Sequence, residues 1–294
     1  MPAIDPDLRL CWLFGPGADA VAHESMLASD ADVLIVDLED FTPEASRAQA
    51  RGLLTALLAR AKVAGKLAAV RINDLGADGP HDLAAAMQAG ADIIAYPKAE
   101  QASQVFALDQ AISHWEHATG APMGSVEILP VCETARGVLD VRDLVRASVR
   151  VRAALLGAED LATDLCAERH PDGLELEQAR RHFLLLCRAA GIEPVDAPYT
   201  YGDGEGARQE TVRSRRLGYR SKSAVRADHA RLIRNVLSPD IDEVAHAKVV
   251  VQTFEAARSR GEERALVGDH WVEVPTYRQA RRLLDRARRL SGLS

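Results

Sequence analysis

DVLIVDLEDFTP, residues 32–43, leads an aliphatic run into three acids and stops it with a Thr-Pro pair. A run that is apolar on both faces predicts a strand buried in a parallel sheet. Asp37, Glu39 and Asp40 repel one another on a rigid element unless a cation, an arginine or a bound ligand compensates them. The stretch therefore predicts a buried strand that ends at a charged site.

Seven more aliphatic runs resemble this one, and helical stretches rich in Ala and Arg separate most of them. Eight strands in alternation with helices is the count of a (β/α)8 TIM barrel. A doubly wound sheet is the alternative, but the first turn, GPGADA, lacks the GxGxxG fingerprint of a dinucleotide site. The eight predicted strands are LCWLFGPG (10–17), DVLIVDLED (32–40), LAAVRIND (67–74), DIIAYPKAE (92–100), VEILPVCET (126–134), RAALLGAED (152–160), IEPVDAPY (192–199) and YRSKSAVR (219–226).

The pattern changes after Ser238-Pro239, where a helix (about 240–260) precedes a short extended piece and a basic helix. We expect a TIM-barrel catalytic domain over residues 1–237 and a C-terminal extension over 238–294. The extension is interpreted as a packed appendage, a lid or an oligomerisation arm. Four predicted helices end at a glycine with a left-handed backbone, namely Gly65, Gly90, Gly191 and Gly218.

Composition narrows the class of protein. The formal net charge of −7 argues against a nucleic-acid partner, which needs a basic face. The four cysteines are scattered without CxxC spacing and read as reduced thiols. The N-terminus has no signal-peptide pattern, and no apolar stretch reaches the about 20 residues of a membrane span. We expect a cytoplasmic protein with no membrane partner.

Charged side chains follow nearly every predicted strand. In a barrel the carboxyl ends of the strands form the catalytic face, so these side chains converge. Carboxylates with one or two basic residues suit Mg²⁺, which could stabilise an enolate, and an arginine there can bind a substrate carboxylate through two hydrogen bonds. The residues are Asp37, Glu39, Asp40, Arg71, Asn73, Lys98, Glu133, Glu159, Asp160 and Asp196.

An ordered set of motifs over most of the chain resembles the citrate lyase β-subunit-like family of the HpcH/HpaI aldolase superfamily, which includes malyl-CoA and citramalyl-CoA lyases. The resemblance implies a TIM barrel, assembled as a trimer or a dimer of trimers. The motifs are LFGPG (13–17), DLED (37–40), VRIND (70–74), AGAD (89–92), YPKAE (96–100), ETARG (133–137), LGAEDLATDL (156–165), AGIEPVDAPY (190–199) and LSPDIDEVAHAKVVV (237–251).

The resemblance also implies residue roles. The family's Mg²⁺ ligands fall on Glu133 and Asp160, and its substrate-binding arginine falls on Arg71. Glu39 and Asp40 correspond to an acidic pair near the metal. The implied reaction is Mg²⁺-dependent carbon–carbon cleavage or formation, in which a β-hydroxyacyl thioester, such as a coenzyme A thioester, splits into an oxo-acid and a thioester enolate.

The basic residues Lys98 and Lys222 are predicted to bind the cofactor part of the substrate. The sequence departs from the family at two places. An Ile-His-Pro stretch is replaced, with Arg226-Ala227 in place of the His-Pro. In the extension, Glu273 stands where relatives carry an aspartate that acts in the active site of a neighbouring subunit. Two alternatives therefore stay open: an acyl-CoA thioesterase on the same scaffold, and a non-catalytic binding or assembly subunit.

Overall fold

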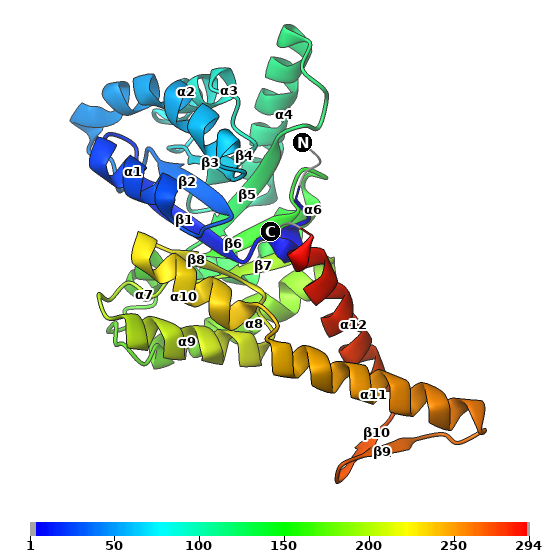
Figure 1. Ribbon diagram of the computed structural model, residues 1–294. Coiled ribbons are helices and arrows are strands. Elements are labelled where there is room, and N and C mark those ends of the chain that lie inside the picture. The colour runs from blue at the N-terminus through cyan, green and yellow to red at the C-terminus, as the bar shows by residue number, and fades with distance from the viewer. Residues whose placement is uncertain (1–3, 293–294) are drawn as a thin grey trace. The chain divides into compact units, whose positions relative to one another are not determined.

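The computed structural model describes residues 4–292, which form two compact units that meet at Leu237 and Ser238 (Figure 1). In the first unit eight parallel strands pair in chain order, and β8 pairs with β1 to close the barrel. The predicted (β/α)8 barrel is confirmed. The strands are β1 (Cys11–Pro16), β2 (Val33–Asp37), β3 (Leu67–Arg71), β4 (Ile93–Tyr96), β5 (Glu127–Cys132), β6 (Ala153–Leu156), β7 (Glu193–Asp196) and β8 (Ser221–Ala224).

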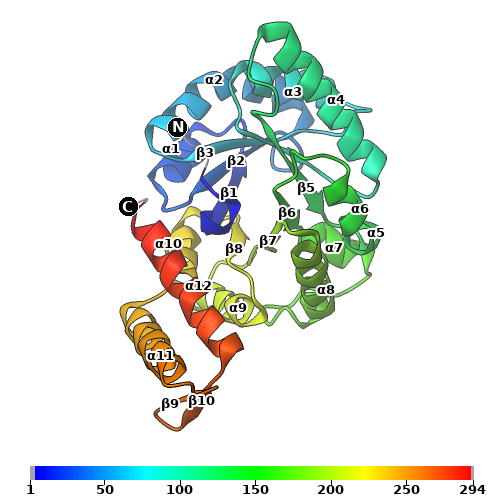
Figure 2. The same cartoon turned by 90° about the vertical axis from the view of Figure 1, so that its right-hand side faces the viewer.

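Helices surround the ring of strands, as the view in Figure 2 shows. The predicted left-handed glycines at helix ends are confirmed, with φ between 73° and 116°. The helices are η1 (Pro6–Leu8), α1 (Ala20–Ala28), η2 (Glu44–Ser46), α2 (Arg47–Val63), α3 (Gly79–Gln88), α4 (Ala102–Thr119), α5 (Ala135–Leu139), α6 (Val141–Arg146), α7 (Glu159–Asp164), α8 (Leu174–Ala190), α9 (Gly204–Leu217) and α10 (Ala227–Leu237).

One buried cluster fills the lumen of the barrel. Because successive side chains of a strand point to opposite faces, only every second residue can join it. The cluster includes Phe14 (β1), Ile35 (β2), Ala69 (β3), Val131 (β5) and Val195 (β7). This alternation decides which residues at the strand ends point into the mouth of the barrel and which point toward the helices.

The second unit consists of α11 (Ile241–Ser259), the hairpin β9 (Ala265–Val267) and β10 (His270–Val272), and α12 (Val274–Ser291). Asp240 and Glu243 form a capping box at the start of α11, so the break after the Ser-Pro pair is also a new helix N-terminus. The unit has a small core of its own, in which Phe254 stacks on Tyr277 with ring centroids 4.9 Å apart.

The helical C-terminal extension predicted from the sequence is therefore present, and its role as a lid or an assembly arm stays a prediction. Within residues 4–292 no helix is both long and apolar enough to cross a membrane.

Candidate active site

Three charged residues stand two positions beyond lumen residues on their strands. Asp37 follows Ile35, Arg71 follows Ala69, and Glu133 follows Val131. They therefore point into the mouth of the barrel at its C-terminal end, above the apolar filling. All three are at most 5% exposed. The predicted convergence on one rim holds for these residues.

Arg71 is held on several sides. Its Nε donates to Asp37 Oδ1 at 3.0 Å, and its Nη2 donates to the other oxygen of that carboxylate. Its Nη1 lies 2.8 Å from Glu39 Oε2 and 3.9 Å from Glu133 Oε2. Burial would lower the pKa of Arg71, but the charges of these carboxylates outweigh burial and raise it. The guanidinium thus stays charged, and Asp37 occupies the edge that would otherwise bind a carboxylate with two hydrogen bonds.

Glu133 lies in a tight cradle formed by Gly157 and the backbone N–H of Lys98. A Cβ on Gly157 would come within 2.4 Å of Glu133 Cβ and 2.7 Å of Glu133 Oε2, so only glycine fits beside it. The backbone N–H of Lys98 donates to Glu133 Oε1 at 2.9 Å. Burial raises the pKa of Glu133 to about 7, against the lowering effect of Arg71.

The Lys98 ammonium contacts three acids, Glu39, Asp40 and Asp160. It donates to Glu39 Oε1 at 2.8 Å and lies 3.7 Å from Asp40 Oδ2 and 3.8 Å from Asp160 Oδ2. Asp160 is in the first turn of α7, which follows β6, and Asp40 is in the loop after β2. The structure therefore brings together seven predicted residues in one polar cluster: Asp37, Glu39, Asp40, Arg71, Lys98, Glu133 and Asp160.

The donor set of this cluster suits Mg²⁺ bound by few protein ligands. Among residues 4–292, no three His, Cys, Asp or Glu side chains are arranged to hold a metal ion together. Mg²⁺ commonly takes only one or two carboxylates and completes its shell with water and substrate oxygens. The predicted pair is Glu133 and Asp160, which Lys98 contacts through its backbone N–H and its ammonium, respectively. Two carboxylate ligands with open positions fit Mg²⁺ better than a softer metal.

The chain matches a known protein family over most of the barrel. The family model HpcH/HpaI aldolase/citrate lyase matches residues 10–227. The chain belongs to this family. The predicted family and the predicted enzyme class, a carbon–carbon lyase, are thereby confirmed.

Relatives of known activity match nearly the full chain. Citrate lyase subunit beta of Escherichia coli is 33% identical, over 97% of this chain and 95% of its own length. L-malyl-CoA/beta-methylmalyl-CoA lyase of Cereibacter sphaeroides is 32% identical, over 96% of this chain and 95% of its own. The crystal structure of CitE from Mycobacterium tuberculosis in complex with magnesium, acetoacetate and coenzyme A has a TM-score of 0.75 and 28% identity, covering 98% and 99% of the two chains. That structure contains the two ligands predicted from the sequence.

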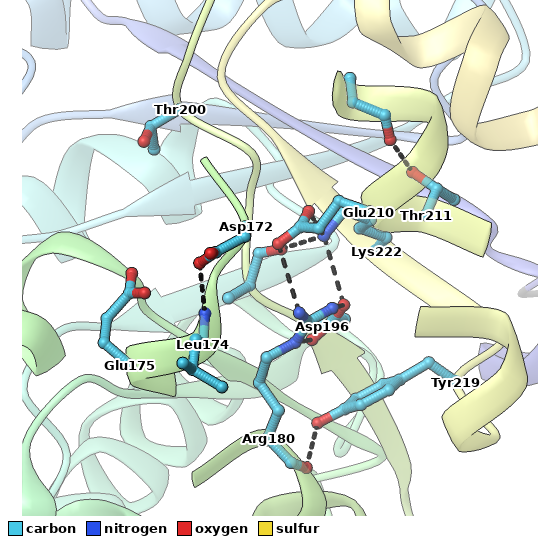
Figure 3. Close-up of polar contacts among 12 residues, drawn as sticks. Asp172, Leu174, Glu175, Arg180, Asp196, Thr200, Glu210, Thr211, Tyr219 and Lys222 are labelled. Carbon is cyan, nitrogen blue, oxygen red and sulfur yellow. Dashed lines mark hydrogen bonds and ion pairs between the residues drawn. The ribbon is translucent and has the colours of Figure 1, made fainter. Parts of the chain in front are cut away.

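Lys222 lies in a second ionic cluster, with Asp196, Glu210 and Arg180 (Figure 3). It has the opposite strand parity to the lumen residues, so it points toward the helices and is fully buried. Its Nζ lies 3.2 Å from Asp196 Oδ2 and 2.7 Å from Glu210 Oε2, and it donates to the Ala197 carbonyl. Arg180 completes the cluster with two hydrogen bonds to Asp196. The predicted role of Lys222 in cofactor binding stays a prediction. Asp196, expected on the rim, points toward the helices instead, where it accepts from Arg180.

Glu273 belongs to the C-terminal unit, where it is exposed at the N-terminus of α12. Its predicted part in catalysis is a statement about a neighbouring copy of the chain and stays a prediction. Arg226 pairs with Asp228 at the start of α10, at 2.7 Å, in the segment where the family's His-Pro is replaced.

The sequence did not predict the polar contacts that join the loop after β7 to the first turn of α7. Glu159 accepts from Thr200 Oγ1 at 2.6 Å and from Arg169 Nε at 3.1 Å, and Arg169 also pairs with Glu175. Glu159 is the neighbour of Asp160, so this network holds the turn that carries the predicted metal ligand. The only sequence signal is Glu159 itself, which the pattern of charges predicts on the rim without indicating its partners.

Proposed function

We propose that the protein is a Mg²⁺-dependent lyase that cleaves, or in reverse forms, the carbon–carbon bond of a short β-hydroxyacyl coenzyme A thioester of the malyl-CoA or citramalyl-CoA type. The convergence of Arg71, Glu133 and Asp160 at the mouth of the barrel carries the proposal. The activities of the malyl-CoA lyase relatives support the substrate class.

In the cleavage direction the substrate hydroxyl gives its proton to water, and its carbon becomes the carbonyl of an oxo-acid as the carbon–carbon bond breaks. The electrons of the broken bond pass to the other fragment, which leaves as a thioester enolate and takes up a proton. Mg²⁺, when bound by Glu133 and Asp160, supplies positive charge for the developing oxyanion.

The chain's own residues hold the fragments. Arg71 faces the oxo-acid half through Nη1, because Asp37 holds its other edge. Asp37 therefore fixes the orientation of the guanidinium before substrate binds, which lowers the entropic cost of reaching the reactive geometry. Glu39 and Asp40 hold the Lys98 ammonium in the metal-free protein and order water beside Asp160 when the metal is bound.

A carboxylate from a neighbouring copy completes the proposed site. Glu273, on the extension, exchanges the proton with the enolate carbon, which requires a homo-oligomer, a trimer or a hexamer. Location in the cytoplasm, where coenzyme A thioesters are made and used, belongs to the same proposal.

The test is an assay of purified protein with malyl-CoA and with citramalyl-CoA, in Mg²⁺ and in EDTA. Glyoxylate or pyruvate is measured together with acetyl-CoA. We expect Mg²⁺-dependent release of both products, lost in E133Q and unchanged in the control E168Q, which alters an exposed carboxylate. Free coenzyme A without oxo-acid would identify a thioesterase. Absence of both turnover and Mg²⁺ binding would favour the binding subunit.

A further inference from the structure

Lys98 has an unusual backbone conformation. Its φ is +46°, and within residues 4–292 the only other non-glycine residue with positive φ is Cys166. A residue with a Cβ adopts this left-handed region only where its surroundings enforce it. Here the N–H of Lys98 is directed at Glu133 Oε1, 2.9 Å away, so a predicted metal ligand anchors the backbone that presents the lysine.

The Lys98 ammonium lies among acids from separate elements. It contacts Glu39 and Asp40 from the β2 side and Asp160 from α7. In the described part of the chain, Arg71 forms ion pairs with Asp37, Glu39 and Glu133 but none with Asp160 or Asp40. The ammonium is therefore the cation that compensates these two carboxylates.

The side chain of Lys98 borders solvent, so it has room to turn outward. It is 47% exposed, whereas that of Arg71 is 6% exposed. A lysine ammonium carries its charge at neutral pH, and within 4 Å of Asp160 that charge repels any divalent ion bound there.

We propose that the Lys98 ammonium is a built-in counter-cation of the metal site. It neutralises Glu39, Asp40 and Asp160 when no divalent ion is bound, and it turns out toward solvent when Mg²⁺ binds Asp160. The inference rests on the proposed function, since it takes Glu133 and Asp160 as the Mg²⁺ ligands. This role is separate from the predicted role of Lys98 in binding coenzyme A, and the measurements below test it without any thioester present.

The first measurement is the Mg²⁺ dissociation constant of metal-free, full-length protein by calorimetry at fixed ionic strength. K98M removes the charge and nearly keeps the length, and K98R keeps the charge. We expect K98M to bind Mg²⁺ at least fivefold more tightly than the wild type, and K98R to stay within threefold of it. The melting temperature of K98M should fall below that of the wild type in EDTA, and saturating Mg²⁺ should close the gap.

The second measurement needs no variant, so it decides the matter even if K98M does not fold. Reductive methylation of wild-type lysines is followed by mass spectrometry with and without Mg²⁺. Methylation of Lys98 should accelerate at least threefold in Mg²⁺, while Lys62, 42% exposed and paired with Asp92, serves as the internal control.

Unchanged methylation of Lys98, or equal or weaker Mg²⁺ binding by a folded K98M, overturns the inference and leaves the proposed function standing. A wild-type protein that binds no Mg²⁺ overturns both.

Discussion

Asp37 and Arg71 are register partners on β2 and β3, and the Asp37 carboxylate accepts two hydrogen bonds from one edge of the Arg71 guanidinium. Asp37 also accepts from the backbone N–H groups of Glu39 and Phe41. Asp37, at the end of β2, and Glu39, just after it, therefore have different tasks. Asp37 anchors the arginine and its own loop, and Glu39 bridges Arg71 to Lys98.

Replacement of Asp37 by Asn tests this anchoring. The amide loses the charge that holds Arg71, and the guanidinium shifts toward Glu39 and Glu133. We expect kcat/KM for the thioester to fall by about 100-fold, as small displacements of positioning groups do. The Mg²⁺ dissociation constant should change less than kcat/KM. Steady-state kinetics and calorimetry check this, with D140N, at an exposed pair with Arg136, as the control. Wild-type kinetics in D37N would contradict the anchoring role.

Mg²⁺ binding should depend on pH through Glu133. Its pKa of about 7 means that the carboxyl is largely protonated below pH 7, and a protonated carboxyl does not bind Mg²⁺. The apparent Mg²⁺ dissociation constant should rise about tenfold per pH unit below 7 and level off above it. Calorimetry from pH 5.5 to 8.5 measures this, and a flat profile would be inconsistent with Glu133 as a ligand.

The same pKa fixes the sign of a stability change in metal-free protein. The folded pKa lies above the ordinary value of 4.5, so between 4.5 and about 7 the folded state binds a proton that the unfolded state has released. Glu133 therefore makes the protein less stable as the pH rises through this window. In E133Q the free energy of unfolding in urea should depend less on pH between 4.5 and about 7 than in the wild type.

Gly157→Ala tests the cradle of Glu133. The added methyl group would meet the Glu133 side chain at 2.4 Å, so the carboxylate must move. We expect Mg²⁺ affinity to fall by at least about tenfold, on the scale of other changes that misorient a metal ligand. Gly52→Ala is the matched control, since a methyl group there has nothing within 4 Å and lies inside α2, where it should stabilise by about 1 kcal/mol. Equal Mg²⁺ affinities in the two variants would show that the close packing of Gly157 against Glu133 does not position the carboxylate.

The barrel could be predicted from the sequence because each strand is a short apolar run, and a run that is buried on both faces looks the same in any register. That symmetry is also why the direction of single side chains could not be predicted. Asp37 and Asp196 both end aliphatic runs, yet Asp37 points into the mouth of the barrel and Asp196 toward α8 and α9. Alternation along a strand assigns the two faces only once one lumen residue is known.

The gathering of charged side chains at the strand ends could be predicted from the sequence, as for Glu133 and Asp160, and their role as metal ligands stays a prediction. Contacts that depend on the conformation of a loop could not be predicted, because the spacing of residues along the sequence carries no information on them. The left-handed backbone of Lys98 and the contacts of Arg169 across two loops are of this kind.

Arg169→Met tests the network behind Asp160. Arg169 bonds to Glu159 and Glu175 and lies over the Tyr201 ring, so it joins the segment after α7 to the loop after β7. Its loss should weaken Mg²⁺ binding about 10-fold, as loss of groups that orient metal ligands does. R181M, at an exposed pair with Glu177 on α8, is the control. If both variants bind Mg²⁺ like the wild type, the network does not position Asp160.

Lys222→Met separates two roles for a buried lysine. The fully buried ammonium compensates Asp196 and Glu210, so its removal leaves carboxylates without their partner. Breaking such a buried pair costs about 3–5 kcal/mol, and this loss should appear in the free energy of unfolding in urea. KM for the thioester should stay within twofold of the wild type, because the side chain faces the helices rather than the mouth of the barrel. K62M, at a half-exposed lysine, should change neither quantity. A KM raised tenfold at unchanged stability would instead favour the predicted role of Lys222 in binding the acyl carrier.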